Sequence, residues 1–259
     1  TIPGDYEPEP QHGGGGNGPG NTGDLENYDT PANMLKASKF LNKIDDSQLS
    51  PCMKAVLAYV KSLSNGSVAT IIKKFSGTMP GYNWTIKDGT LPPFTNGSTN
   101  PLYSSITGTV TTIFDSQKFI NGSDLAVART ILHESVHAYL VAYFKNDNAT
   151  YMLDYGKLLD KWNNVKNASA NDYQHDLITK NFVADIGIAL KEYGMNRGYN
   201  LSDQFYQDLA WGGLESTNAF INLSNSDKNR IKDIIVIEHS GLDRFGNSQN
   251  KKGNNSGCN

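Results

Sequence analysis

The residues with the clearest capacity for chemistry lie in the string Leu132-His133-Glu134-Ser135-Val136-His137, which contains the pattern H-E-x-x-H. Positions i and i+4 of a helix lie above one another on one face, so His133 and His137 can both reach a single metal ion. Glu134 lies about 100° around the helix from His133, where it can hold and deprotonate a metal-activated water. The pattern predicts a metal site with two imidazole ligands and Glu134 as general base.

A catalytic zinc site needs a third protein ligand and an open fourth position. Our candidate is His175, which lies in the first turns of a predicted helix and shares a face with apolar residues. The alternative for His175 is a buried histidine satisfied by a backbone carbonyl. Rival ligands are Glu215, Asp176, Asp185 and His239, although Asp176 or Asp185 could instead orient an imidazole. One zinc ion is the default choice, because imidazole nitrogens suit zinc.

Most of the chain has the periodicity of helices. Ser50-Pro51 is typical of a helix start, and Ser123-Asp124 is a good N-terminal cap for the helix that carries H-E-x-x-H and ends near Phe144. A long helix begins near Asn171 and is expected to stop at Gly194. Further helices are predicted over residues 53–63, 68–75, 151–162, 205–209, 217–221 and 226–238.

A small sheet is predicted between the first helix and the H-E-x-x-H helix. Gly, Pro and Thr punctuate residues 77–121, where Tyr82, Trp84 and Ile86 alternate with other residues as strand residues do. Residues 106–114 are rich in Thr, Val and Ile and indicate another strand.

Charge and hydropathy narrow the class of protein. The 259 residues carry 23 Lys and Arg against 26 Asp and Glu, so no nucleic-acid partner is expected. No apolar run approaches the roughly 18 residues that a membrane span needs. Residues 1–30 are rich in Gly and Pro and predict a disordered tail or linker, which could tether the chain to a larger protein or a lipid anchor. Residues 31–241 are expected to form one domain and residues 242–259 a flexible C-terminal tail.

The string Trp211-Gly212-Gly213-Leu214 and the two cysteines each have two interpretations. The glycines could line a cleft near the ion, or they could end a helix while Trp211 fills the core, which we favour. Cys52 is expected to be a small core residue and Cys258 to be solvated. A disulfide between Cys52 and Cys258 is the alternative in an exported protein.

The string around His133 resembles the zincin metallopeptidases. Leu140 and Tyr143 stand where the metzincins have Gly and a third His, and Phe182 stands where thermolysin-like enzymes have a Glu ligand. The chain as a whole looks like predicted zinc metallopeptidase modules at the C-termini of secreted bacterial surface, lipoprotein-like and toxin-like proteins. The shared strings are Pro51-Cys52, Ala128 through Leu140, Gln174-His175-Asp176 and Leu209 through Leu214.

This resemblance implies an α+β, mostly helical, zincin-like fold, with a small mixed sheet before the active-site helix and a helical C-terminal half. It implies a secreted or cell-surface bacterial zinc metalloendopeptidase acting on protein or peptide substrates, with His175 as third ligand. In zincins an extended substrate pairs with an edge strand, and residues 107–114 are our candidate for that strand. The alternatives are a catalytically inactive binding or adaptor module with the same fold, and a surface structural protein with an accidental motif.

Overall fold

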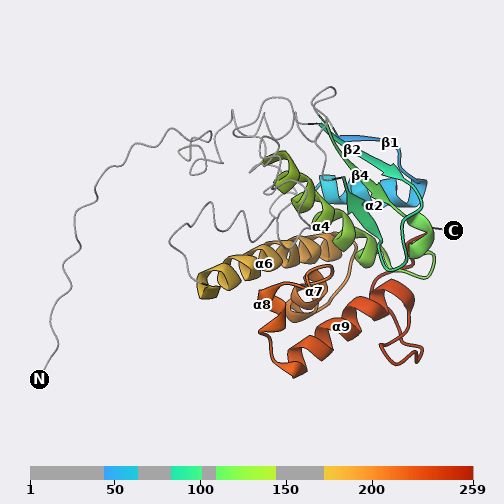
Figure 1. The fold of residues 1–259 in the computed structure, drawn as a ribbon. Helices are drawn as coiled ribbons and strands as arrows, with labels where there is room; N and C mark the ends of the chain where they lie inside the picture. The colour runs from blue at the N-terminus through green and yellow to red at the C-terminus, as the bar shows by residue number, and fades with distance from the viewer. Residues whose placement is uncertain (1–43, 64–82, 101–108, 144–171, 259) are drawn as a thin grey trace, which may run out of the picture.

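Helices and one small sheet make up the part of the chain that the computed structural model describes, residues 44–63, 83–100, 109–143 and 172–258 (Figure 1). Side chains are described throughout these ranges except at residues 83, 139–140, 142–143 and 172–181. The fold is α+β, and about half of the described residues are helical. The elements are β1 (Ile44–Gln48), α2 (Pro51–Lys61), β2 (Asn83–Asp88), β3 (Gly97–Thr99), β4 (Thr109–Phe114), η2 (Ser116–Phe119), α4 (Asp124–Tyr143), α6 (Asp172–Asn196), α7 (Asp203–Ala210), α8 (Asn218–Ile221) and α9 (Asn225–Ser240).

The sheet is mixed and has four strands in the order β1-β2-β4-β3. β1, β2 and β4 run parallel, whereas β3 pairs antiparallel with β4. The predicted alternation in β2 is confirmed, since Trp84 and Ile86 point into the core. β4 alternates in the same way, with Val110, Thr112 and Phe114 buried. β1 and β3 were not predicted, because they are short and lack an alternating apolar pattern.

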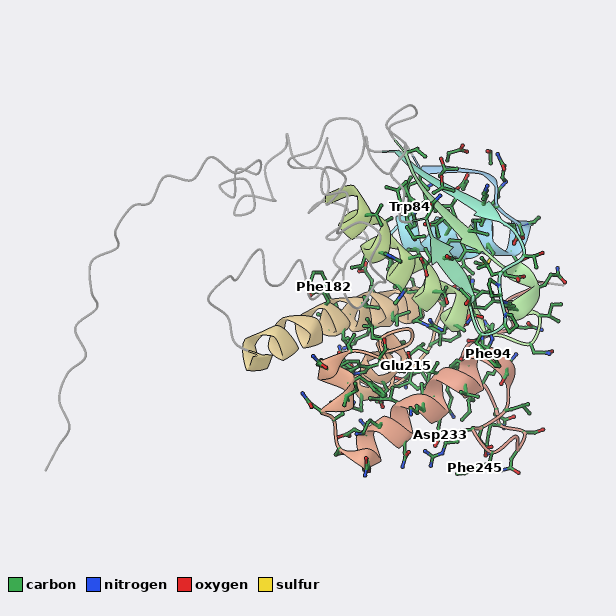
Figure 2. All side chains as sticks on the ribbon, in the orientation of Figure 1. Trp84, Phe94, Phe182, Glu215, Asp233 and Phe245 are labelled. Carbon is green, nitrogen blue, oxygen red and sulfur yellow. A yellow bond between two sulfur atoms is a disulfide. The ribbon has the colours of Figure 1, made fainter. Side chains whose placement is uncertain are left out.

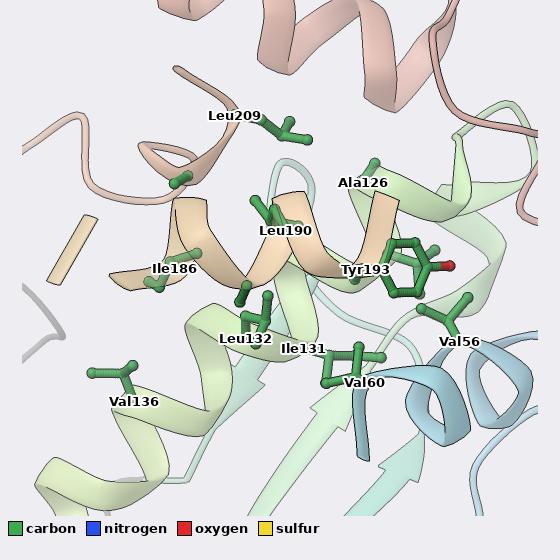
Figure 3. Packing of buried hydrophobic residues seen from close by; sticks show 14 of the residues in the cluster. Val56, Val60, Ala126, Ile131, Leu132, Val136, Ile186, Leu190, Tyr193 and Leu209 are labelled. Atoms are coloured by element: carbon green, nitrogen blue, oxygen red, sulfur yellow. The ribbon is translucent and has the colours of Figure 1, made fainter. Parts of the chain in front are cut away.

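Helix α4 lies between the sheet and the C-terminal helices (Figure 1). It packs on β3, β4 and α2 on one side and on α6, α7 and α9 on the other, so nearly all of its described side chains are buried. Figure 3 shows this packing, with Val60 of α2, Ile131 and Leu132 of α4, and Leu190 of α6 in one apolar cluster. The predicted helices over residues 53–63, 205–209, 217–221 and 226–238 correspond to α2, α7, α8 and α9.

Helix α6 passes the position where we expected it to stop. It continues through Gly194 to Asn196, and the left-handed residue beyond it is Gly198, with φ +80°. Gly194 instead lets α7 approach, because a Cβ there would lie 2.1 Å from the Tyr206 hydroxyl. The glycine near the end of the predicted helix therefore serves helix packing, and the stop lies four residues later.

The segment after α9, where we expect a flexible tail over residues 242–259, makes hydrogen bonds to the body of the protein. The Asp124 amide at the start of α4 donates to the Asn254 carbonyl. The buried carboxylate of Glu238 accepts two backbone N–H groups of the segment, at 2.6 and 3.1 Å. These bonds connect the C-terminal residues to both α4 and α9. The two bonds to Glu238 supply the donors that a buried carboxylate needs.

Cys52 and Cys258 form a disulfide, with Cα atoms 5.1 Å apart. Cys258 is buried, so our expectation that it is solvated is wrong, and the alternative interpretation of a bridge is the one that the structure adopts. The bridge joins α2 to the C-terminal segment across 206 residues of sequence.

Several expectations fall on parts of the chain that lie outside the described residues. These are the tail over residues 1–30 and the helices over residues 68–75 and 151–162. In the part that is described, no helix is both long and apolar enough to cross a membrane.

Candidate active site

Helix α4 carries the three residues of the predicted site on adjacent positions of its surface. Ser123 begins the helix as expected, and its hydroxyl accepts the Ala126 amide at 3.1 Å. About three turns later His133 and Glu134 are buried, with 8% and 4% of their surface exposed, and His137 is half-buried. His137 Nδ1 lies 3.8 Å from Glu134 Oε2. The structure thus places the Glu134 carboxylate beside the His137 ring on α4.

His133 has an uncharged ring at neutral pH. Burial lowers its pKa to about 4, and the Arg129 guanidinium contributes to the same direction. The ring also donates a hydrogen bond to the Gly212 backbone carbonyl. A neutral imidazole tied to a carbonyl is the form in which histidine usually binds metals.

Glu134 is a buried carboxylate that its surroundings keep ionised. Burial alone would raise its pKa, but the adjacent His137 ring, whose Nδ1 lies 3.8 Å from Oε2, and the Thr99 hydroxyl act in the opposite direction, and the net shift is downward. Thr99 Oγ1 donates to Oε2 at 2.7 Å. Strand β3 passes so close that a Cβ at Gly97 would lie 3.0 Å from Oε1. The carboxylate is therefore held between α4 and β3 in the form that can accept a proton.

The Gly212-Gly213 pair lies directly over the site, while Trp211 is buried beside Phe220. A Cβ at Gly213 would lie 2.6 Å from His133 Cε1, and one at Gly212 would lie 2.7 Å from Arg129 Nε. Gly213 also has φ +86°, a backbone conformation that favours glycine. Trp211 fills the core, as we favoured, and the glycines let the backbone approach His133 and Arg129 closely.

We expect Gly213→Ala to displace the His133 ring and to weaken metal binding by about 10- to 100-fold, the usual cost of disturbing the support of a ligand. The matched control is Gly246→Ala. Gly246 has φ +85°, but open space surrounds it. The control carries the same backbone strain without the contact. Equal zinc affinities of the two variants, measured by competition with a chromophoric chelator, would refute a role for Gly213 at His133.

Arg129 is a member of this site that the sequence analysis did not identify. It lies one turn before His133, is buried, and has no hydrogen-bond partner for Nε within the described part of the chain. Burial lowers its pKa, while the charges of Glu215 and Glu134 act in the opposite direction. Arg129 lies four residues before His133 on an apolar helix, and this spacing places the two side chains on the same face. That spacing is the feature of the sequence from which Arg129 could have been predicted. Thr99 was also missed, and nothing in the string around it indicated a role.

Three of the four rival ligands, whose side chains the structure describes, do not form a metal-binding group with the two histidines. Among the side chains that the structure describes, no group of three His, Cys, Asp or Glu residues could hold a metal ion, which covers Asp185, Glu215 and His239. Glu215 Oε2 accepts the Gly213 amide at 2.8 Å. The His239 ring packs edge-on against Phe119 instead.

The candidate third ligand, His175, lies in the first turn of α6, and α6 packs on α4. The side chains of His175 and Asp176 lie outside the described set. Their roles as ligand and as orienting group therefore stay predictions.

Comparison of the chain with protein-family models, with curated proteins and with solved structures finds no match.

Proposed function

We propose that this protein is a zinc-dependent metalloendopeptidase that acts on protein or peptide substrates. The observation that supports this most is the Glu134 carboxylate, which is buried, ionised and held between an imidazole of the same helix and strand β3. A buried charge costs several kcal/mol unless its surroundings compensate it, so this group is a candidate for function. A buried proton acceptor beside two histidines is what peptide hydrolysis at neutral pH requires.

The donor set fits zinc. His133 and His137 come from successive turns of α4, and the hydrogen bond from His133 to the Gly212 carbonyl orients a ligand in the way usual for zinc sites. We assign the third position to His175, with the fourth open. When bound, zinc lowers the pKa of a coordinated water toward 7 and polarises the peptide carbonyl.

The residues of the chain supply the rest of the chemistry. Glu134 accepts a proton from the attacking water and passes it to the leaving amine. An extended substrate pairs with a sheet edge, and our first candidate for that edge was residues 107–114. Over Thr112–Phe114, β4 is paired on both sides, by β2 and by β3, and the sheet order places β3 at the edge. We assign substrate pairing to β3, the edge strand next to Glu134.

An exported location suits this enzyme. The disulfide between Cys52 and Cys258 is stable in oxidising surroundings and is rare in the cytosol. We place the protein outside the cell or at a bacterial cell surface, where the N-terminal Gly- and Pro-rich segment would serve as tether.

The test of the proposed function is a measurement of metal and of cleavage on the purified chain. We expect one zinc per chain by atomic emission, and cleavage of denatured casein that a chelator stops and added zinc restores. His175→Ala should lose most of the zinc, and the control His239→Ala should keep it, because His239 packs on Phe119. A chain that binds no metal, or that cleaves equally well in chelator, rules the proposal out. Full zinc content in His175→Ala would transfer the third position to another residue.

A further inference from the structure

A chain of buried hydrogen bonds runs from the sheet to the Glu134 carboxylate. The Trp84 indole N–H on β2 donates to Thr112 Oγ1 on β4 at 2.8 Å. Thr112 Oγ1 lies 2.8 Å from Thr99 Oγ1 on β3, and Thr99 Oγ1 lies 2.7 Å from Glu134 Oε2. All four residues are at most 4% exposed. Figure 2 labels Trp84 at the sheet end of this chain.

The chemistry of the four groups requires that every hydrogen bond in this series is donated in the same direction, from Trp84 toward Glu134. An indole N–H can only donate, and the Thr99 hydroxyl donates to Glu134 Oε2. A hydroxyl has a single proton, and Thr99 uses it for Glu134, so Thr112 must donate its own proton to Thr99. Each hydroxyl therefore accepts one bond and donates one, and such ordered chains strengthen their members.

The register of the sheet places the two hydroxyls. Thr99 and Thr112 are direct partners in the antiparallel β3–β4 pair, so their side chains lie on the same face, toward α4. Gly97, two residues earlier on β3, has no side chain to displace the carboxylate. The other contact of the Thr99 hydroxyl, to the Glu134 backbone carbonyl, is longer, at 3.5 Å.

We propose that Thr99 is a positioning residue for the general base. It binds Oε2 of Glu134, supported by Thr112 and Trp84, and thereby fixes the orientation of the carboxylate that accepts the proton. This inference rests on the proposed peptidase function and adds to it, because it makes β3 both the strand that pairs with substrate and the strand that orients the base.

The test compares three variants of the zinc-loaded chain. Thr99→Val removes the hydroxyl and keeps the β-branched shape, so we expect kcat to fall about 10- to 100-fold with KM unchanged. Thr99→Ser restores a donor and should restore kcat. The matched control is Thr111→Val, on the neighbouring position of β4, whose side chain points to the opposite face of the strand from Thr112. Zinc content and melting temperature are measured for each variant, so that loss of metal or of fold is separated from loss of positioning.

A second measurement does not depend on activity. With ¹⁵N-labelled tryptophan, the Trp84 indole resonance is assigned from Trp84→Phe, and we expect it to move upfield in Thr99→Val, because Thr112 loses its acceptor and the indole bond weakens. It should stay in place in Thr111→Val. A wild-type kcat in Thr99→Val, or an unmoved Trp84 resonance, overturns the positioning role while the peptidase proposal stands. A wild-type chain that cleaves no peptide overturns both, so the two failures are distinguishable.

Discussion

Glu134→Gln will lower kcat for peptide cleavage by about 10²- to 10⁴-fold, the usual contribution of a general base, and will leave the zinc content unchanged. Glutamine has nearly the same shape as glutamate, and its carbonyl oxygen can still accept the Thr99 hydroxyl. The side chain can no longer take up a proton. The variant therefore separates proton transfer from metal binding and from the packing of α4 against β3.

The matched control for Glu134→Gln is Glu238→Gln. Glu238 is also fully buried, but its carboxylate accepts backbone amides of the C-terminal segment. Glu238 lies beside the start of α4, about three turns from the H-E-x-x-H residues, so this control should lose stability and retain kcat. Normal cleavage by Glu134→Gln would show that the base is assigned wrongly. A loss of zinc in that variant would show that Glu134 serves the metal site itself.

Replacing both cysteines, as Cys52→Ser with Cys258→Ser, will lower the free energy of unfolding by about 3–5 kcal/mol. The bridge closes a loop that spans 206 residues, and the entropy that a crosslink removes from the unfolded chain grows with loop length. Urea denaturation of the wild-type and double-serine chains measures the difference. In the double variant the C-terminal segment is no longer bonded covalently to α2, but the hydrogen bonds of this segment to Glu238 and Asp124 remain.

The control for the disulfide prediction is treatment with reductant. Dithiothreitol should lower the stability of the wild-type chain to that of the double-serine variant and should leave the variant unchanged. Two thiols that react in the native, unreduced protein would contradict the bridge. An unfolding free energy equal to that of wild type in the variant would contradict its contribution to stability.

Much of the helical architecture was predictable, because helices depend on neighbours a few residues apart. The apolar stripe of α2, the Ser123 cap of α4 and the bounds of α9 follow from periodicity and capping. Strands with strong alternation, β2 and β4, were also found. β1 and β3 were missed, because a strand of three to five mostly polar residues is stable only once a neighbouring strand has formed.

The candidate site likewise contains some residues that local sequence predicts and others that only the fold brings together. The sequence by itself placed His133, Glu134 and His137 on adjacent positions of one helix, since the spacing of an α-helix alone requires it. Only the tertiary structure brought Thr99 to the Glu134 carboxylate, Gly213 to the His133 ring and Cys258 to Cys52. Those pairs are separated by tens to hundreds of residues, and no local pattern encodes them. They form only when the sheet register and the packing of α4 bring distant parts of the chain together.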